Sequence, residues 1–214
     1  MQRLKNEIKE KIITISIAEF LKKGFMAASL RDIARAVGIS TGNLYNYFPG
    51  KEQLFYAIVE DVKREIDLIG NYAVNRIFWG IFDSDEKMLQ YIELISEIHF
   101  NLLKKYGREF VILLECSKGT RLQNFKMNLI SRTEKSYFHI IKGRGVLGDE
   151  NIRKYQYLMH IISANYIDGL VKITRNYKSY KMLKSDLYLF NEYHVKGMVT
   201  FFRQIPSPVE NKLS

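Results

Sequence analysis

Apolar residues recur at intervals of three and four along most of the chain, a spacing that predicts amphipathic α-helices. The chain contains three prolines, none before position 49, so long helices can run without interruption. The pattern predicts an all-α fold of about nine helices. They are expected over residues 5–23, two short segments within 29–48, 51–72, 85–106, 108–116, 122–142, 149–177 and 186–202.

Two of these segments are short and lie close together, in the stretch SLRDIARAVGISTGNLYNYFPGK at residues 29–51. Ser29 and Ser40 are suited to cap the start of a helix. Gly38 can end the first helix in a left-handed turn, and Pro49 disfavours helical geometry in the residue before it. The stretch therefore predicts a helix-turn-helix.

The second of these helices carries small and hydrogen-bonding side chains at its start, as is typical of a helix that enters the major groove of DNA. Gly42 would allow close approach of the backbone, while hydroxyl, amide and cationic groups suit base edges and phosphates. The residues predicted to bind DNA are Ser29, Arg31, Ser40, Thr41, Gly42, Asn43, Tyr45, Asn46, Tyr47 and Lys51.

A set of residues in this stretch resembles the N-terminal signature of the TetR family of transcriptional regulators. The set comprises Gly24, Ser29, Ile33-Ala34, Val37-Gly38-Ile39-Ser40, Gly42, Leu44-Tyr45, Phe48, Lys51-Glu52 and Leu54. The resemblance covers residues 8–58 without a gap. It implies an all-helical homodimer, usually a repressor, whose larger C-terminal domain binds a small effector. Asn43 and Tyr47 stand at positions that vary in the family, so the operator sequence does not carry over.

The charge distribution agrees with contact to phosphate. The chain has a formal net charge of +10, and residues 1–51 hold +5 of it, from nine Lys and Arg against four Asp and Glu. We therefore expect a DNA-binding domain at residues 1–50. Residues 51–214 are expected to form an effector-binding and dimerisation domain, linked to the first by the helix that starts at Lys51.

The resemblance implies that the last two long helices pack against their copies in a homodimer, although their apolar stripes suit an intrachain core equally. The effector pocket has no motif of its own, so its lining is predicted only from apolar and ionisable residues on the expected helices. The residues are Ile66, Glu97, His99, Phe100, Leu103, Phe110, Leu114, Tyr137, Met159, His160, Tyr166 and Asp168. Aromatic walls would suit a flat apolar ligand, and an acidic side chain in the pocket would suit a cationic ligand.

Other classes of function find little support in the sequence. Cys116 is the only cysteine, and no histidine has a partner at metal-ligand spacing, so we expect no enzyme, cofactor or metal site. The glycines of residues 143–148 lack the strand and the Lys-Ser or Lys-Thr pair of a phosphate loop. Neither a signal peptide nor a membrane-length apolar run is evident, which predicts a cytoplasmic protein. The alternative is an architectural or activating DNA-binding protein whose C-terminal domain binds another protein.

Overall fold

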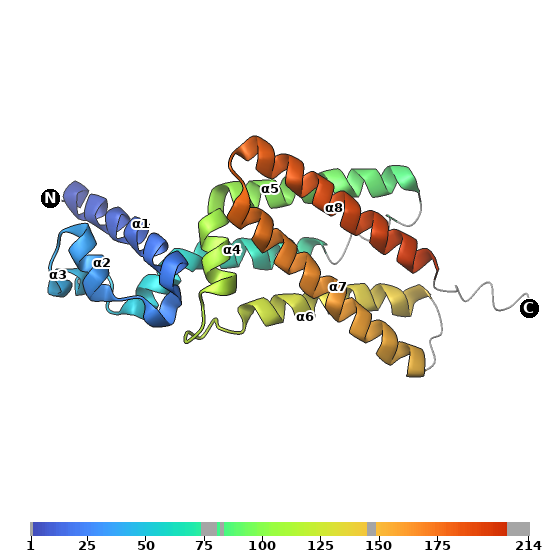
Figure 1. Ribbon diagram of the computed structural model, residues 1–214, viewed down its shortest axis with the longest axis horizontal. Coiled ribbons are helices and arrows are strands. Elements are labelled where there is room, and N and C mark those ends of the chain that lie inside the picture. The colour runs from blue at the N-terminus through green and yellow to red at the C-terminus, as the bar shows by residue number, and fades with distance from the viewer. Residues whose placement is uncertain (1, 74–80, 82–83, 145–148, 205–214) are drawn as a thin grey trace, which may run out of the picture. The chain divides into compact units, whose positions relative to one another are not determined.

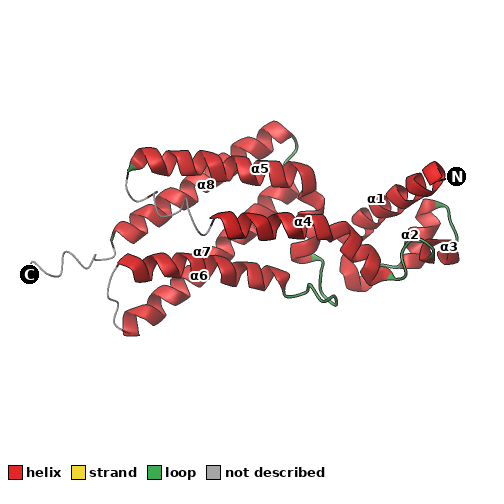
Figure 2. Ribbon diagram, turned by 180° about the vertical axis from the view of Figure 1, so that it is seen from behind, coloured by secondary structure: helices red, strands yellow, loops and turns green. Residues whose placement is uncertain are grey.

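The computed structural model describes residues 2–73, 81, 84–144 and 149–204, and these form eight helices with no strand among them (Figures 1 and 2). The helices are α1 (Gln2–Ala27), α2 (Leu30–Val37), α3 (Thr41–Tyr45), α4 (Lys51–Ala73), α5 (Asp85–Glu115), α6 (Phe125–Arg144), α7 (Asp149–Asn176) and α8 (Tyr180–Arg203). The predicted all-α fold is confirmed. None of the described helices is long and apolar enough to cross a membrane.

The helices fall into two compact units. The first unit comprises Met1–Ile66 and Tyr106–Lys126, and the second comprises Asp67–Lys105 and Met127–Ser214. The first unit thus contains α1 to α3, most of α4, and the end of α5 with the segment that follows it. The second unit contains α7, α8 and most of α5 and α6.

Aromatic packing holds the first unit together. Phe55 of α4 makes edge contacts with Phe20 and Phe25 of α1, at centroid distances of 5.5 and 5.4 Å. Gly24 leaves helical geometry with φ 72° and ψ 168°, which turns the chain so that Phe25 packs back onto this cluster. The backbone N–H of Phe25 then donates to the carbonyl of Cys116 at 2.9 Å. This hydrogen bond fixes Cys116, which is distant in the sequence, to the end of α1.

The second unit has a core shared by α5, α6, α7 and α8. One cluster joins Ile92 and Ile95 to Val195 and Val199, while another joins Met159 to Phe202. Gly169 lets α7 approach α8 closely, because a Cβ at this position would lie 2.2 Å from Cζ of Phe190. Tyr157 and Ile161 of α7 and Tyr193 of α8 remain exposed among the described residues.

Several predicted boundaries differ from the structure, beginning with the first helix, which spans Gln2–Ala27 rather than residues 5–23. The helices expected at residues 85–106 and 108–116 are joined in α5, with a kink at Tyr106 (φ −130°, ψ 26°) rather than a break at Gly107. The helix expected from residue 122 begins at Phe125. The last helix begins at Tyr180, not at residue 186, because Ser179 caps it and Leu183 extends its buried stripe by a turn. The expected connection at 73–83 and glycine loop at 143–148 lie largely outside the described residues.

Candidate DNA-binding face and candidate effector site

Side-chain caps define both helices of the predicted helix-turn-helix. Ser29 accepts a hydrogen bond from the Asp32 N–H at 3.3 Å, and Ser40 accepts one from the Asn43 N–H at 3.1 Å. Gly38, with φ 86° and ψ 30°, closes α2 by donating its N–H to the Ala34 and Arg35 carbonyls. The predicted motif is therefore present, with the turn supplied by a glycine in left-handed geometry.

The two faces of α3 differ sharply in exposure. Leu44 is fully buried and Phe48 is 4% exposed, so both anchor the helix to the rest of the unit. On the other side, Gly42, Tyr45 and Asn46 are exposed. The leading end of α3 is therefore at the surface, as entry into a groove of DNA requires.

The remaining predicted DNA-binding residues differ in their exposure. Ser40 and Arg31 are exposed, and Arg31 forms no ion pair with any residue that the structure describes. Half-buried positions are occupied by Ser29, Thr41, Asn43, Tyr47 and Lys51. Exposure and charge thus leave Arg31 available to a phosphate.

Lys51 is engaged within the protein itself. Its ammonium donates to the carbonyls of Met26 at 3.1 Å and Ala28 at 2.9 Å, and lies 4.6 Å from the centroid of the Phe25 ring. Partial burial lowers the pKa of Lys51. The side chain therefore ties the start of α4 to the end of α1, a role that the sequence did not reveal.

The twelve predicted effector residues are divided between the two units. Ile66, Phe110 and Leu114 are buried in the first unit, whereas the other nine belong to the second. Leu103, Tyr137 and Met159 are buried in the core of the second unit, and Asp168 is half-buried. His160 lies at the surface, where Nδ1 contacts a carboxylate oxygen of Glu134 at 3.1 Å.

Two of the predicted residues take part in a buried polar network. Tyr166 donates to the Asn191 side-chain oxygen at 2.7 Å and lies 3.5 Å from Nδ1 of His99. Asn191 in turn donates to Ser96 at 3.1 Å. The Tyr166 ring also stacks on His194, whose Nε2 is hydrogen-bonded to the Tyr137 hydroxyl at 2.8 Å.

Burial sets the protonation of this network. Loss of solvent lowers the pKa of His99 to about 4 and that of His194 to about 4. Both imidazoles are therefore neutral near pH 7, where each can accept one hydrogen bond and donate another. Sequence inspection missed Asn191, His194 and Ser96, since only the packing of α5 against α8 brings them together.

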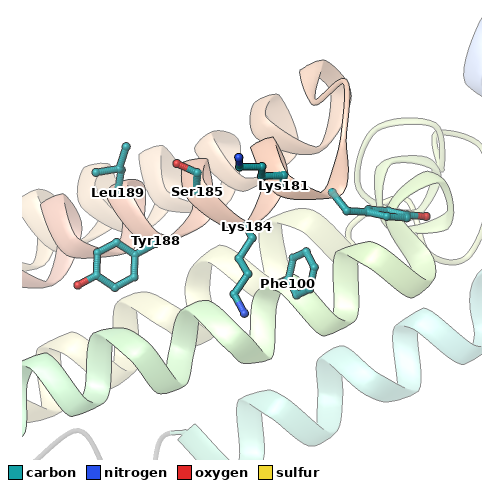
Figure 3. A pocket seen from close by; sticks show the side chains of 7 residues that line it. Phe100, Lys181, Lys184, Ser185, Tyr188 and Leu189 are labelled. Carbon is teal, nitrogen blue, oxygen red and sulfur yellow. The ribbon is translucent and has the colours of Figure 1, made fainter.

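A groove with a volume of about 570 Å³ lies on the surface of the second unit (Figure 3). Its walls come from Phe100 of α5 and from α8, which contributes Tyr180, Lys181, Lys184, Tyr188 and Leu189. Glu97, another predicted effector residue, is exposed beside it and forms an ion pair with Lys184 at 2.9 Å. The lysines were missed because the last helix was expected to begin at residue 186, although Ser179 is a recognisable cap.

Comparison with known proteins connects the first unit to one family. Residues 12–58 match the model of bacterial regulatory proteins of the tetR family, which confirms the resemblance found in the sequence. The HTH-type transcriptional regulator YerO of Bacillus subtilis is 47% identical over 55 residues, which are 26% of this chain and 19% of that protein. The negative transcriptional regulator IcaR of the icaADBC biofilm operon of Staphylococcus aureus is 30% identical over 99 residues.

The aligned part of the IcaR comparison covers 41% of this chain and 53% of IcaR, so the chain spans about half the length of that relative. A solved structure extends the likeness to nearly the whole fold. NalD, the secondary repressor of the MexAB-OprM multidrug efflux pump in Pseudomonas aeruginosa, is 19% identical with a TM-score of 0.51. That likeness covers 90% of this chain and 97% of NalD, and at this identity it shows the fold alone.

Proposed function

We propose that the chain, whose residues 12–58 match the tetR family of bacterial regulatory proteins, is a DNA-binding transcriptional repressor of that family. It acts in the cytoplasm, where it binds a pseudo-palindromic operator as a homodimer and leaves it when a small effector binds. The observation that carries the proposal is the presentation of α3, with Leu44 buried behind it and Gly42, Tyr45 and Asn46 exposed in front.

The proposed DNA contacts divide by chemistry. Thr41, Asn43 and Asn46 reach base edges or nearby phosphates from α3, and Gly42 admits the sugar-phosphate backbone closely. Arg31 of α2 supplies an exposed charge that is free to neutralise a phosphate. Because Lys51 holds the end of α1, it supports the position of the face in addition to any phosphate contact.

The homodimer is proposed from the outer faces of α7 and α8. Large apolar side chains remain exposed there, with Tyr157 at 67%, Ile161 at 37% and Tyr193 at 80%. Exposed apolar residues that gather on adjacent helices mark an interaction surface. A two-fold interface through these helices would supply two copies of α3 to the half-sites of one operator.

The DNA assignment is tested on fragments selected from a genomic library by the purified protein. Arg31→Gln is expected to weaken binding about tenfold and to reduce the slope of log K against log salt by about one. Arg153→Gln, which removes an exposed charge from α7, serves as the matched control and should change neither quantity. Equal salt slopes for native protein and Arg31→Gln would remove Arg31 from the proposed interface.

The dimer is tested separately by light scattering after size exclusion. Ile161→Glu combined with Tyr193→Glu places charges on the proposed interface and should yield a folded monomer with much weaker operator binding. Leu94→Glu is the control, because Leu94 is 40% exposed on α5 and lies on another helix. A doubly substituted protein that remains dimeric would move the interface elsewhere.

A further inference from the structure

The groove on the second unit combines a volume suited to a small ligand with an unusual local charge. Its volume of about 570 Å³ falls in the range of small-molecule sites. Residues 169–185 contain five basic residues at every third position, Lys172, Arg175, Lys178, Lys181 and Lys184, and no acidic residue. Asp168 and Asp186 flank this stretch, and of its five basic residues Lys181 and Lys184 line the groove itself.

The lysines of the groove are not all neutralised by the protein. Lys181 forms no ion pair within the described part of the chain. Lys184 extends toward Phe100 between α8 and α5, as Figure 3 shows, and its carboxylate partner among the described residues, Glu97, is itself exposed. One exposed carboxylate, paired with Lys184, against the two lysines of the lining leaves a net positive charge, which an incoming anion can neutralise.

The aromatic rings of the groove lie within reach of these charges. The Phe100 centroid is 5.4 Å from the Lys184 ammonium and 5.6 Å from the Lys104 ammonium, which is also 5.6 Å from the Tyr180 centroid. Tyr188 and Leu189 add apolar surface along α8. Flat apolar rings and ammonium groups thus face the same space. An inorganic anion would contact only the ammonium groups, and an uncharged hydrocarbon would contact only the rings.

We propose that this groove binds a small organic anion that carries a flat apolar group, such as an aromatic carboxylate. The flat group lies against Phe100, Tyr180 and Tyr188, while the carboxylate forms ion pairs with Lys181 and Lys184. Ser185, which also lines the groove, can donate its hydroxyl hydrogen to the same carboxylate. A cationic ligand is disfavoured because it would meet the ammonium groups of Lys181 and Lys184, which line the groove.

This inference rests on the proposed repressor function, because the ligand of the groove would be the effector of that repressor. The lining of the groove then indicates the chemical class of the effector. It also revises the expectation of an acidic anchor, because Glu97 is already held by Lys184. Among the residues first predicted for the effector, Phe100 keeps a direct role. His99, Tyr166 and Tyr137 belong instead to a network whose polar atoms satisfy one another.

Calorimetric titration of the full chain with three compounds of one ring system tests the groove. 2-Naphthoate is expected to bind at least about tenfold more tightly than the neutral 2-naphthalenemethanol or the cationic 2-naphthylmethylammonium. Lys181→Gln combined with Lys184→Gln should abolish this preference for the anion. Lys172→Gln combined with Lys178→Gln removes the same charge from positions outside the lining, and should retain at least half of the native affinity.

Phe100→Leu provides a second variant that keeps every charge and removes the flat wall, and it should weaken naphthoate binding about tenfold. Equal affinities for the anion and the alcohol would overturn the proposal, as would native affinity in the Lys181/Lys184 variant. Circular dichroism of each variant shows that the fold is kept. A variant that unfolds is replaced by Lys181→Gln alone, whose expected loss of affinity is about threefold.

The regulatory role is decided in a separate measurement on the selected operator. Release of the protein from DNA by naphthoate, absent in the Lys181/Lys184 variant, supports the groove as the effector site. If naphthoate binds without changing operator affinity, the groove is not the effector site. The proposals that the groove binds organic anions and that the protein binds DNA would both still hold. A protein that binds naphthoate but no DNA overturns the repressor, while the calorimetric comparison still decides the groove.

Discussion

The DNA-binding face and the groove differ in how far apart their residues lie in the sequence. The face is built from 23 consecutive residues, 29–51, in which caps and a left-handed glycine fix the geometry locally. The groove joins Phe100 to Tyr180 and Lys184, which are about eighty residues away on another helix. A local motif can be recognised in a sequence, whereas a site assembled by packing needs the structure.

The two regions also differ in what their buried faces contain. Leu44 and Phe48 hold the DNA-binding face through apolar contacts alone. In the second unit, the buried Tyr137 and His99 and the half-buried Tyr166 and His194 are joined by hydrogen bonds, next to apolar clusters. The apolar contacts behind the DNA-binding face should contribute the same stability at any pH near neutrality. The contribution of the histidine network to the free energy of unfolding should change as the pH falls.

The largest expected effect is the acid sensitivity of the second unit. His99 and His194 have a pKa of about 4 in the folded state, below the value of about 6.5 in an unfolded chain. The unfolded chain therefore binds more protons, so the free energy of unfolding falls as the pH drops from about 6.5 to about 4. Each histidine contributes at most about 3 kcal/mol to this fall.

Urea unfolding at several pH values measures this dependence. The substitution His194→Gln removes one titrating group and should flatten the slope between pH 6.5 and pH 4 compared with the native chain. The difference between the two slopes isolates His194 from the carboxylates that also titrate in acid. Parallel slopes would mean that the His194 imidazole is not desolvated in the folded state.

The next largest effect contrasts the two faces of α3. Leu44→Ala should lower the free energy of unfolding by about 3 kcal/mol, because Leu44 is fully buried, and should abolish operator binding. Tyr45→Ala changes the neighbouring residue, which is 49% exposed, and should leave stability within about 0.5 kcal/mol while weakening DNA binding. Thermal unfolding and mobility shift on the same preparations separate these outcomes.

Prediction from the sequence succeeded where the information was local. Ser29, Ser40 and Gly38 behave as expected, because each acts on backbone atoms within five residues of itself. The helix periodicity gave the all-α fold for the same reason. The start of α8 was missed because Lys181 and Lys184 look like a solvated spacer unless Leu183 is read as part of the buried stripe.

The candidate effector site could not be predicted in the same way. Periodicity shows that His99 and Tyr166 lie on helices, but not that they meet each other and Asn191. Nor does it distinguish a core aromatic residue such as Tyr137 from a groove residue such as Phe100. Such distinctions depend on which helices pack together and at what register, and that is a property of the whole chain.

A smaller effect concerns the support that Lys51 gives to the DNA-binding face. Lys51→Met keeps an apolar stem against Phe25 but loses the hydrogen bonds to Met26 and Ala28, which should cost about 1 kcal/mol of stability. If support is its main role, Lys51→Met lowers the melting temperature without changing the salt slope of operator binding. A salt slope reduced by about one would instead assign Lys51 a phosphate contact.

The smallest effect expected lies where α4 meets the segment after α5, within the first unit. The Tyr56 hydroxyl donates to Glu52 at 2.6 Å and accepts from the Arg121 backbone N–H at 3.2 Å. The hydroxyl also accepts from Arg121 Nε at 3.1 Å, so Tyr56→Phe removes three hydrogen bonds and keeps the ring, whose centroid lies 4.8 Å from the Arg121 guanidinium. Hydrogen exchange of the Arg121 amide should become about tenfold faster, with operator affinity changed less than about twofold.

The amide of Phe25 provides the internal reference for that measurement, since it donates to Cys116 and not to Tyr56. If both amides exchange faster in Tyr56→Phe, the hydroxyl supports the whole segment against α1 and α4. If only the Arg121 amide responds, the contact is local. Unchanged exchange at both amides would show that the ring alone holds the segment, and that the hydroxyl hydrogen bonds add nothing measurable.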